Sequence, residues 1–156
     1  MAEQSLNLEL LAIGRSSVDL YGEQVGGRLE DMGSFAKYVG GSPTNTVVGA
    51  ARLGLRAGLL TRVGADHMGR YVREQLAREG VNTDGVITDP QRLTALAILG
   101  IRDRATFPLI FYRENCADMA LEPADLETVD PAPAAVLING THLSKPNVRA
   151  LSLAAA

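Results

Sequence analysis

Glycine and polar residues gather in four short segments, each of which follows an apolar run of the sequence. These segments are residues 14–19, 40–45, 64–66 and 139–142. In open α/β sheets, ligands collect at the carboxyl ends of the strands, so we expect the four segments to form one rim. The rim would present carboxylates, amides and unobstructed main chain. Such a set of groups is suited to binding a polyol.

Four residues of this rim are candidates for contact with sugar hydroxyls. The carboxylate of Asp19 can accept two hydroxyl hydrogen bonds. Gly40 and Gly41 would let a ligand approach the main chain without a β-carbon in the way. Asn45 can both donate and accept from the first turn of a helix. Taken singly, each residue is as well explained as a turn or a cap, so the prediction rests on their combination.

Several other chemistries lose support from the sequence. The glycine-rich segment lacks both the Gly-x-Gly-x-x-Gly pattern and the Gly-Lys-Ser/Thr ending of phosphate-binding loops. With Cys116 as its one cysteine, the chain can form no internal disulfide, and with two histidines we expect no built-in metal site. No serine and aspartate accompany His142 in a hydrolase triad. A net charge of −3 gives no general attraction to nucleic acid or to an anionic membrane.

The elements that must position the rim alternate between strand and helix patterns. We expect buried strands at 6–13, 57–63 and 134–139, helices at 42–53 and 66–79, a short helix at 122–128, and a helix starting near 144. Ser42 is a candidate cap for the first helix and Asp66 for the second. This alternation predicts an α/β protein with a parallel sheet covered by helices. The runs 18–39 and 93–112 do not fit it and are expected to form edge strands or a small separate sheet, the second run as a hairpin.

The spacing of these motifs resembles a known family. The segment Gly-Gly-Ser-Pro-Thr-Asn at 40–45, followed by Gly54 and Gly64, is similar to the first signature of PfkB-family, ribokinase-like carbohydrate kinases. Val47 departs from it, since that position usually holds a small residue. The resemblance runs from about residue 8 to residue 145. It implies that residues 1–156 are the N-terminal part of a kinase domain with a mostly parallel sheet, flanked by helices, and a small β lid. We define the lid as residues 18–39 and 93–113.

Within the family, the segment Phe-Tyr-Arg-Glu-Asn-Cys-Ala-Asp at 111–118 looks most like the 5-dehydro-2-deoxygluconokinases of inositol catabolism. It is also similar to 2-keto-3-deoxygluconate kinases. The guanidinium of Arg113 could bind the carboxylate of an acid sugar with two parallel hydrogen bonds. The competing interpretation is an arginine at the end of a hairpin, paired with Glu114 or Asp118.

The resemblance implies contacts with sugar hydroxyls for Asp19, Gly41 and Asn45, and places Phe111 and Arg113 near the acid group. It also implies a lid that closes over the sugar and often mediates dimerisation, a small-molecule sugar or sugar acid as ligand, and ATP with Mg²⁺ as cofactors of the whole enzyme.

The catalytic Gly-Ala-Gly-Asp motif of the family does not occur in this sequence. We therefore expect no catalytic, nucleotide-binding or metal-binding residue in this chain, and no kinase activity from it alone. Two alternatives stay open: another PfkB kinase, for 2-keto-3-deoxygluconate, fructose or ribose, or a non-catalytic module for sugar binding or dimerisation. A cytoplasmic location is expected, with no nucleic-acid or membrane partner.

Overall fold

The computed structural model describes residues 7–129 and 132–156. Its central element is a four-stranded sheet in the order β5-β4-β1-β8, in which every neighbouring pair is parallel. The strands are β1 (Leu10–Ile13), β4 (Ala57–Gly64), β5 (Val86–Asp89) and β8 (Val136–Ile138). The predicted α/β class is thereby confirmed, as is the parallel sheet.

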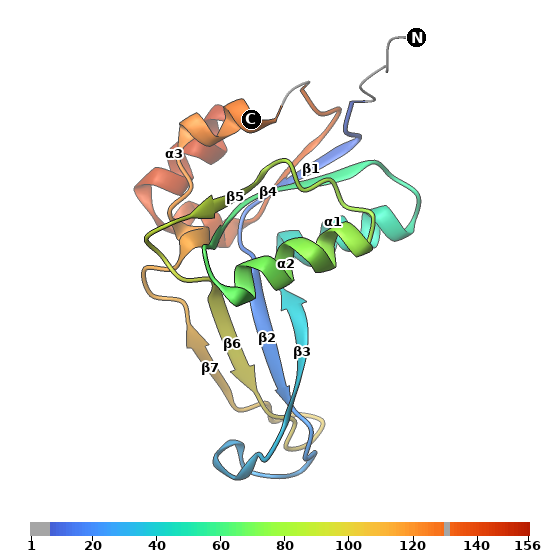
Figure 1. Cartoon of the computed structure of the whole chain (residues 1–156), viewed down its shortest axis with the longest axis vertical. Helices are drawn as coiled ribbons and strands as arrows, with labels where there is room; N and C mark the ends of the chain where they lie inside the picture. The colour runs from blue at the N-terminus through green and yellow to red at the C-terminus, as the bar shows by residue number, and fades with distance from the viewer. Residues whose placement is uncertain (1–6, 130–131) are drawn as a thin grey trace.

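A second four-stranded sheet extends away from the first and comes from the two lid segments (Figure 1). Its order is β3-β2-β6-β7, with β2 parallel to β6 and the outer two pairs antiparallel. The strands are β2 (Ser17–Gly22), β3 (Phe35–Gly40), β6 (Ala95–Leu99) and β7 (Leu109–Tyr112). The expectation of a small separate sheet, with its second run folded as a hairpin, is correct.

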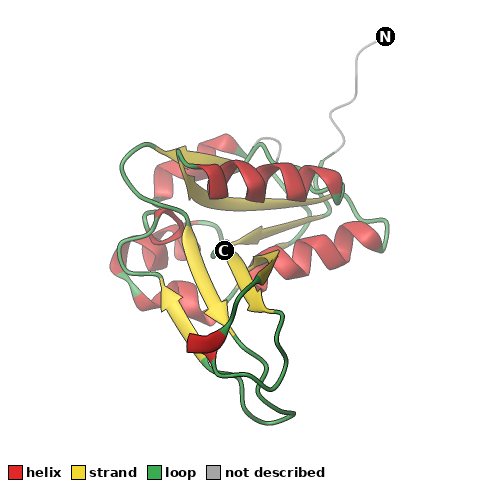
Figure 2. Cartoon of the chain, turned by 60° about the horizontal axis from the view of Figure 1, so that its bottom comes forward, coloured by secondary structure: helices red, strands yellow, loops and turns green. Residues whose placement is uncertain are grey.

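Helices cover both faces of the parallel sheet (Figures 1 and 2). On one face, Ala12 of β1 packs with Val47 and Val72, which come from α1 (Ser42–Arg52) and α2 (His67–Arg78). On the other face, Ile13 packs with Leu151 of α3 (Pro146–Ala154). Side chains of a strand alternate between its two faces, so adjacent residues of β1 enter different clusters of the core.

Short 3-10 helices complete the chain. They are η1 (Leu29–Asp31), η2 (Ala117–Met119), η3 (Pro123–Thr128) and η4 (Gly140–Ser144). In the described part of the chain, no helix combines the length and the apolar character needed to cross a membrane.

The helix termini follow the expected chemistry with one exception. Asp66 caps α2, because its carboxylate accepts from the backbone N–H groups of Met68 and Gly69 at 2.8 Å each. Ser42 does not cap α1: it is the first helical residue, and Gly41 occupies the capping position with a φ of 101°. The hydroxyl of Ser42 instead accepts a hydrogen bond of 2.7 Å from Asn139. That bond joins two of the four predicted rim segments.

Four expectations about elements need correction. The strand β5 was not expected, since its four residues carry no clear alternation. The helix expected at 122–128 is the 3-10 helix η3. The last strand is shorter than 134–139, and it is only partly covered because β8 lies at the edge of the sheet. The first strand also begins later than expected, since β1 starts at Leu10, and Leu6 lies outside the described residues.

Candidate functional site

A pocket of about 310 Å³ lies between the lid and the rim of the parallel sheet. It is lined from the lid by alternate residues of β2, β6 and β7, and from the rim by residues of three of the four predicted segments. The lining residues are Arg15, Ser17, Asp19, Tyr21, Gly41, Ser42, Ala97, Leu99, Leu109, Phe111, Arg113 and Thr141.

Strand register explains why these lid residues share one face. Asp19 of β2 is opposite Ala97 of β6, which is in turn opposite Phe111 of β7. Residues directly opposite one another in neighbouring strands project from the same side of a sheet. The intervening residues Val18 and Leu96 project from the other side and join the core with α1 and α2. One face of the lid sheet therefore lines the pocket, and the other face packs against α1 and α2.

Asp19 lines the pocket from β2. Ser17 donates a hydrogen bond of 2.8 Å to one of its carboxylate oxygens, and within the described residues no other hydrogen bond reaches the carboxylate. Burial raises the pKa of Asp19 above its ordinary value, an effect that Ser17 and Arg113 oppose. The carboxylate is thus held in place with acceptor capacity left for a ligand.

The two glycines are required by contacts within the chain itself. A β-carbon at Gly40 would overlap the carboxylate of Asp19, which lies on the neighbouring strand. A β-carbon at Gly41 would overlap the carbonyl oxygen of Arg15, and the φ of Gly41 lies in the region that favours glycine. The pair therefore keeps the Asp19 carboxylate and the Arg15 backbone close to the start of α1.

Two predicted members of the rim lie elsewhere. Asn45 lies in the first turn of α1 and lines a different hollow, beside Lys37 and Tyr71. The segment 64–66 is used structurally: besides capping α2, Asp66 accepts from the backbone N–H and the hydroxyl of Thr94 at 2.8 and 3.0 Å. Both carboxylate oxygens of Asp66 therefore accept hydrogen bonds within the chain, which agrees with its interpretation as a helix cap.

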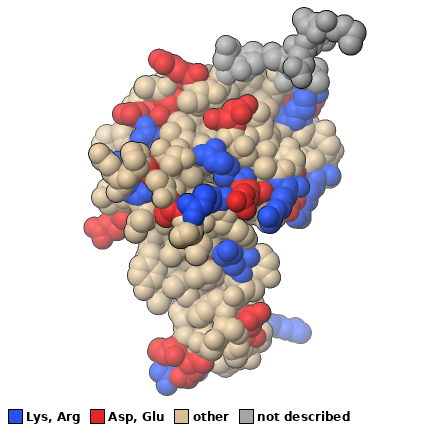
Figure 3. Space-filling model, viewed as in Figure 1, with Lys and Arg blue, Asp and Glu red and all other residues tan. Residues whose placement is uncertain are grey.

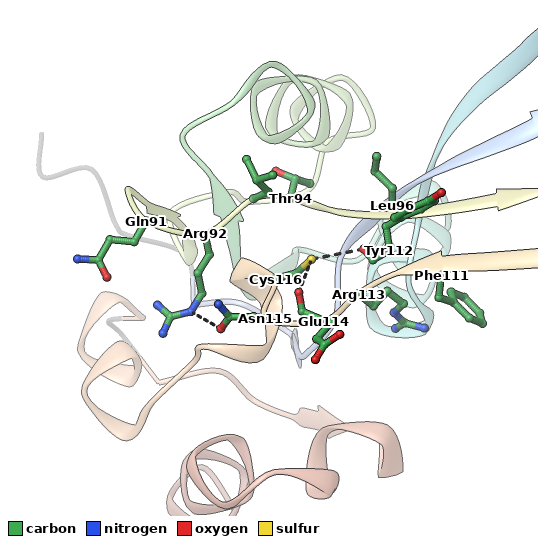
Figure 4. A pocket seen from close by; sticks show the side chains of 11 residues that line it. Gln91, Arg92, Thr94, Leu96, Phe111, Tyr112, Arg113, Glu114, Asn115 and Cys116 are labelled. Atoms are coloured by element: carbon green, nitrogen blue, oxygen red, sulfur yellow. Dashed lines mark hydrogen bonds between the residues drawn. The ribbon is translucent and has the colours of Figure 1, made fainter.

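Arg113 reaches the pocket from the end of β7. Its guanidinium carbon lies 4.8 Å from the centre of the Phe111 ring, a cation–π distance, and Figure 4 shows the two side chains next to each other. Among the described residues it forms no ion pair with Glu114 or Asp118, and its Nε atom is buried without a partner. The competing interpretation of a hairpin-end ion pair is therefore not what the structure has.

Arg15 is the main pocket residue that sequence reasoning did not select. Its Nε donates a 2.7 Å hydrogen bond to the buried carboxylate of Asp118, 103 residues later in the chain. The position of Arg15 directly after β1 was the one feature of the sequence that could have marked it as a pocket residue. No sequence pattern indicated that Asp118 would be its partner. His142 is fully buried close to this pair, with Arg15 and the backbone of Asp118 both affecting its ring.

A larger hollow of about 560 Å³ lies along β6 and β7 and includes Cys116 (Figure 4). Arg92 donates a 3.3 Å hydrogen bond to Asn115 at its edge. Burial and the charge of Asp118 raise the pKa of the Cys116 thiol, so this residue is not an activated nucleophile. Arg113 and Phe111 line both this hollow and the smaller pocket, and Arg92 and Glu114 also line the hollow; only the smaller pocket adds Asp19 and Arg15.

Charges elsewhere are dispersed. In Figure 3, acidic and basic side chains intermingle over the helical layer, and the middle of the visible lid surface carries few of either. Over the described ranges, no three His, Cys, Asp or Glu side chains are grouped so as to hold a metal ion.

Comparison with known proteins decides the family. The family model of pfkB carbohydrate kinases matches residues 7–156. This chain belongs to the pfkB family. Its relatives include the 5-dehydro-2-deoxygluconokinase of Geobacillus kaustophilus, which is 39% identical over 155 residues, spanning 97% of this chain and 46% of that protein. A 5-dehydro-2-deoxygluconokinase 2 of Bacillus cereus is 39% identical over 94% of this chain and 45% of its own length.

Solved structures of pfkB-type kinases share the fold. An uncharacterized sugar kinase from Pyrococcus horikoshii, in complex with ATP, superimposes with a TM-score of 0.81 at 28% identity over 92% of this chain and 47% of its own. The fructokinase of Halothermothrix orenii gives a TM-score of 0.81 at 28% identity, over 95% of this chain and 52% of that one. The ribokinase-like architecture predicted from the sequence is confirmed. The chain spans about half the length of these relatives.

Proposed function

We propose that this chain is the sugar-binding half of an ATP-dependent carbohydrate kinase whose favoured substrate is 5-dehydro-2-deoxy-D-gluconate. The observation that carries the proposal is one pocket that contains both a carboxylate with free acceptor capacity, Asp19, and a guanidinium without an ion pair, Arg113. A sugar acid offers hydroxyls to the first and a carboxylate to the second. The names of the relatives support the same substrate.

The roles proposed for individual residues follow from their positions. Asp19 would bind and orient sugar hydroxyls, and Gly40 and Gly41 would keep the space beside it open. Phe111 would hold the Arg113 guanidinium over its ring so that the charge faces the acid group. For Asn45, a contact with the sugar stays a prediction, because it does not line this pocket.

Phosphoryl transfer would depend on parts that this chain does not contain. The transfer needs a carboxylate to orient the attacking hydroxyl and a metal ion or donors for the charge on the phosphoryl group. The residues present do not fit an Mg²⁺–ATP site: the Gly-Ala-Gly-Asp motif does not occur in the sequence, and the described residues offer no metal-binding cluster. We therefore propose that this chain alone is inactive and that ATP and Mg²⁺ act only in the full-length enzyme.

The lid would close over the bound sugar and exclude water, which competes with the sugar for the phosphoryl group. The face of the lid that points away from the pocket carries exposed apolar side chains, including Ile110 and Tyr112 of β7. We propose a homodimer through this lid, and the cytoplasmic location and role in inositol catabolism that such a kinase would have.

Two other functions share some of this support. The first is another PfkB kinase, for 2-keto-3-deoxygluconate, fructose or ribose. The similarity to a fructokinase structure supports the shared fold, but a neutral sugar such as fructose would give Arg113 no carboxylate to bind. The second is a non-catalytic module for sugar binding or dimerisation, which the exposed apolar lid would suit.

Replacement of Arg113 by methionine tests whether the pocket is built for an acid sugar or for a neutral one such as fructose or ribose. The substitution removes the charge and keeps most of the apolar stem. We expect calorimetry to show a loss of about 10- to 100-fold in affinity for 5-dehydro-2-deoxygluconate, since hydrogen bonds to charged groups contribute about 1.5–3 kcal/mol. Fructose or ribose should bind equally to both proteins. Equal binding of the acid sugar by both proteins would refute the role of Arg113.

A further inference from the structure

The side chain of Arg15 forms part of the pocket and is almost fully enclosed. Only 13% of it is exposed, and its Nη2 atom is buried without a hydrogen-bond partner. Buried guanidinium N–H groups are normally hydrogen-bonded, because leaving a charged donor unpaired is unfavourable. The enclosed Nη2 is matched by an equally unpartnered, enclosed oxygen of Asp118, whereas the side chain as a whole lines the pocket with only its Nε hydrogen-bonded, so donor capacity remains for a ligand there.

The position of Arg15 is fixed from several sides. Asp118, with a side chain that is 0% exposed, accepts from its Nε at 2.7 Å. The buried hydroxyl of Thr44 in α1 donates to its backbone carbonyl at 3.1 Å, and the absence of a side chain at Gly41 permits that approach. The backbone of Arg15 is thus held by α1 and its guanidinium by Asp118 before any ligand arrives, which is what a preorganised binding group requires.

A second guanidinium in the same pocket has the same vacancy. Arg113 also lines the pocket, and its Nε is buried without a partner. Burial, and next the like charge of Arg15, lower the pKa of Arg113. Asp118 offsets part of this repulsion but is already bonded to Arg15, and Asp19 is not within ion-pair distance of either arginine among the described residues. Two like charges with vacant donors favour an anion between them.

We propose that Arg15 and Arg113 together form one carboxylate-binding subsite, in which Arg15 is a specificity-determining residue and Asp118 positions it. This inference deepens the proposed function: the acid group of the sugar would be bound by two guanidinium groups rather than by Arg113 alone. Its hydroxyls would remain with Asp19. A neutral sugar would leave both vacant donors unpaired and would bind more weakly.

The direct test is NMR of the arginine side chains in the intact chain. The Nε–H signals of Arg15 and Arg113 are followed during titration with D-gluconate, and with D-glucitol, in which an alcohol replaces the carboxylate. We expect gluconate to shift both signals and glucitol to shift neither. A shift of the Arg113 signal alone, or of neither signal, overturns the two-arginine subsite.

Substitution tests the contribution to specificity. Arg15→Met should weaken gluconate binding by about 10- to 100-fold and change glucitol binding less than about 3-fold. Arg149→Met, at an exposed position of α3 that does not line the pocket, is the matched control and should leave both affinities unchanged. Equal weakening of gluconate and glucitol by Arg15→Met would assign Arg15 a merely structural role and overturn the proposal.

These experiments distinguish a failure of the two-arginine subsite from a failure of the proposed function. If 5-dehydro-2-deoxygluconate does not bind but gluconate shifts both arginine signals, the subsite stands and the substrate assignment fails. If 5-dehydro-2-deoxygluconate binds and only the Arg113 signal responds to either acid, the function stands and the role of Arg15 fails.

Discussion

The buried histidine beneath the pocket makes the stability of the protein dependent on pH. His142 is 0% exposed, and among the described residues the backbone of Asp118 is the one neighbour that favours its protonated form. Burial, and after it the positive charge of Arg15, lower the pKa of His142 from 6.5 to about 4. The folded protein therefore holds His142 neutral at pH values where the unfolded chain would protonate it.

The sign and size of the effect follow from these two values. Between pH 6.5 and about pH 4 the unfolded chain binds more protons at this position than the folded protein does, so acid favours unfolding. The stability is fully present above pH 6.5 and is lost as the pH falls towards 4. At about 1.4 kcal/mol per pH unit, the loss amounts to about 3 kcal/mol of unfolding free energy.

The assay compares the chain with its His142→Gln variant by denaturant unfolding at several pH values from 7 to 4. His67, exposed at the start of α2, is replaced by glutamine in both proteins so that only one histidine titrates. Asp118, whose pKa burial raises, acts in the opposite direction but is common to both proteins. We expect the variant to gain about 3 kcal/mol relative to the histidine protein as the pH falls. A difference that is the same at pH 7 and pH 4 would refute the reasoning.

Three further substitutions test how the elements support the site. Gly40→Ala should reduce sugar binding at least about tenfold, because the new methyl group would occupy the space of the Asp19 carboxylate; unchanged calorimetric affinity would contradict this. Asp66→Ala should lower the free energy of unfolding by about 1–2 kcal/mol through loss of the α2 cap, as measured with urea, and an unaltered midpoint would argue against the cap. Leu59→Ala should cost about 2–5 kcal/mol because this side chain is buried in the core, whereas Leu53→Ala, at an exposed position, should stay within about 0.5 kcal/mol; similar costs for the two would contradict the described packing.

Elements with strong local signals were predictable from the sequence. Asp66 begins a helix with apolar residues at four-residue spacing, and the structure has α2 there, capped as expected. The hairpin of β6 and β7 was visible as two β-rich runs around a polar turn. The strand β5 was missed because its four residues, Val-Ile-Thr-Asp, show no clear periodicity, and its pairing with β4 is set by tertiary structure.

The candidate site was predictable only where it followed from position after a strand or from the family resemblance. Asp19 was selected in the first way and Arg113 through the resemblance of segment 111–118 to a kinase subfamily, and the pocket contains both. The pairing of Arg15 with Asp118 joins residues 103 positions apart, and no local pattern encodes it. Asn45 was predicted to contact the sugar because an asparagine in the first turn of a helix can both donate and accept. In the structure α1 is oriented so that Asn45 lines another hollow.

The measurement that tests the central claim most directly is calorimetric titration of this chain with 5-dehydro-2-deoxygluconate and, separately, with Mg²⁺–ATP. We expect the sugar acid to bind at one site and the nucleotide to show no saturable binding. Saturable binding of Mg²⁺–ATP would contradict the claim that the nucleotide pocket belongs to the other half of the enzyme. Failure of the sugar acid to bind would contradict the proposed role of the pocket between the lid and the rim.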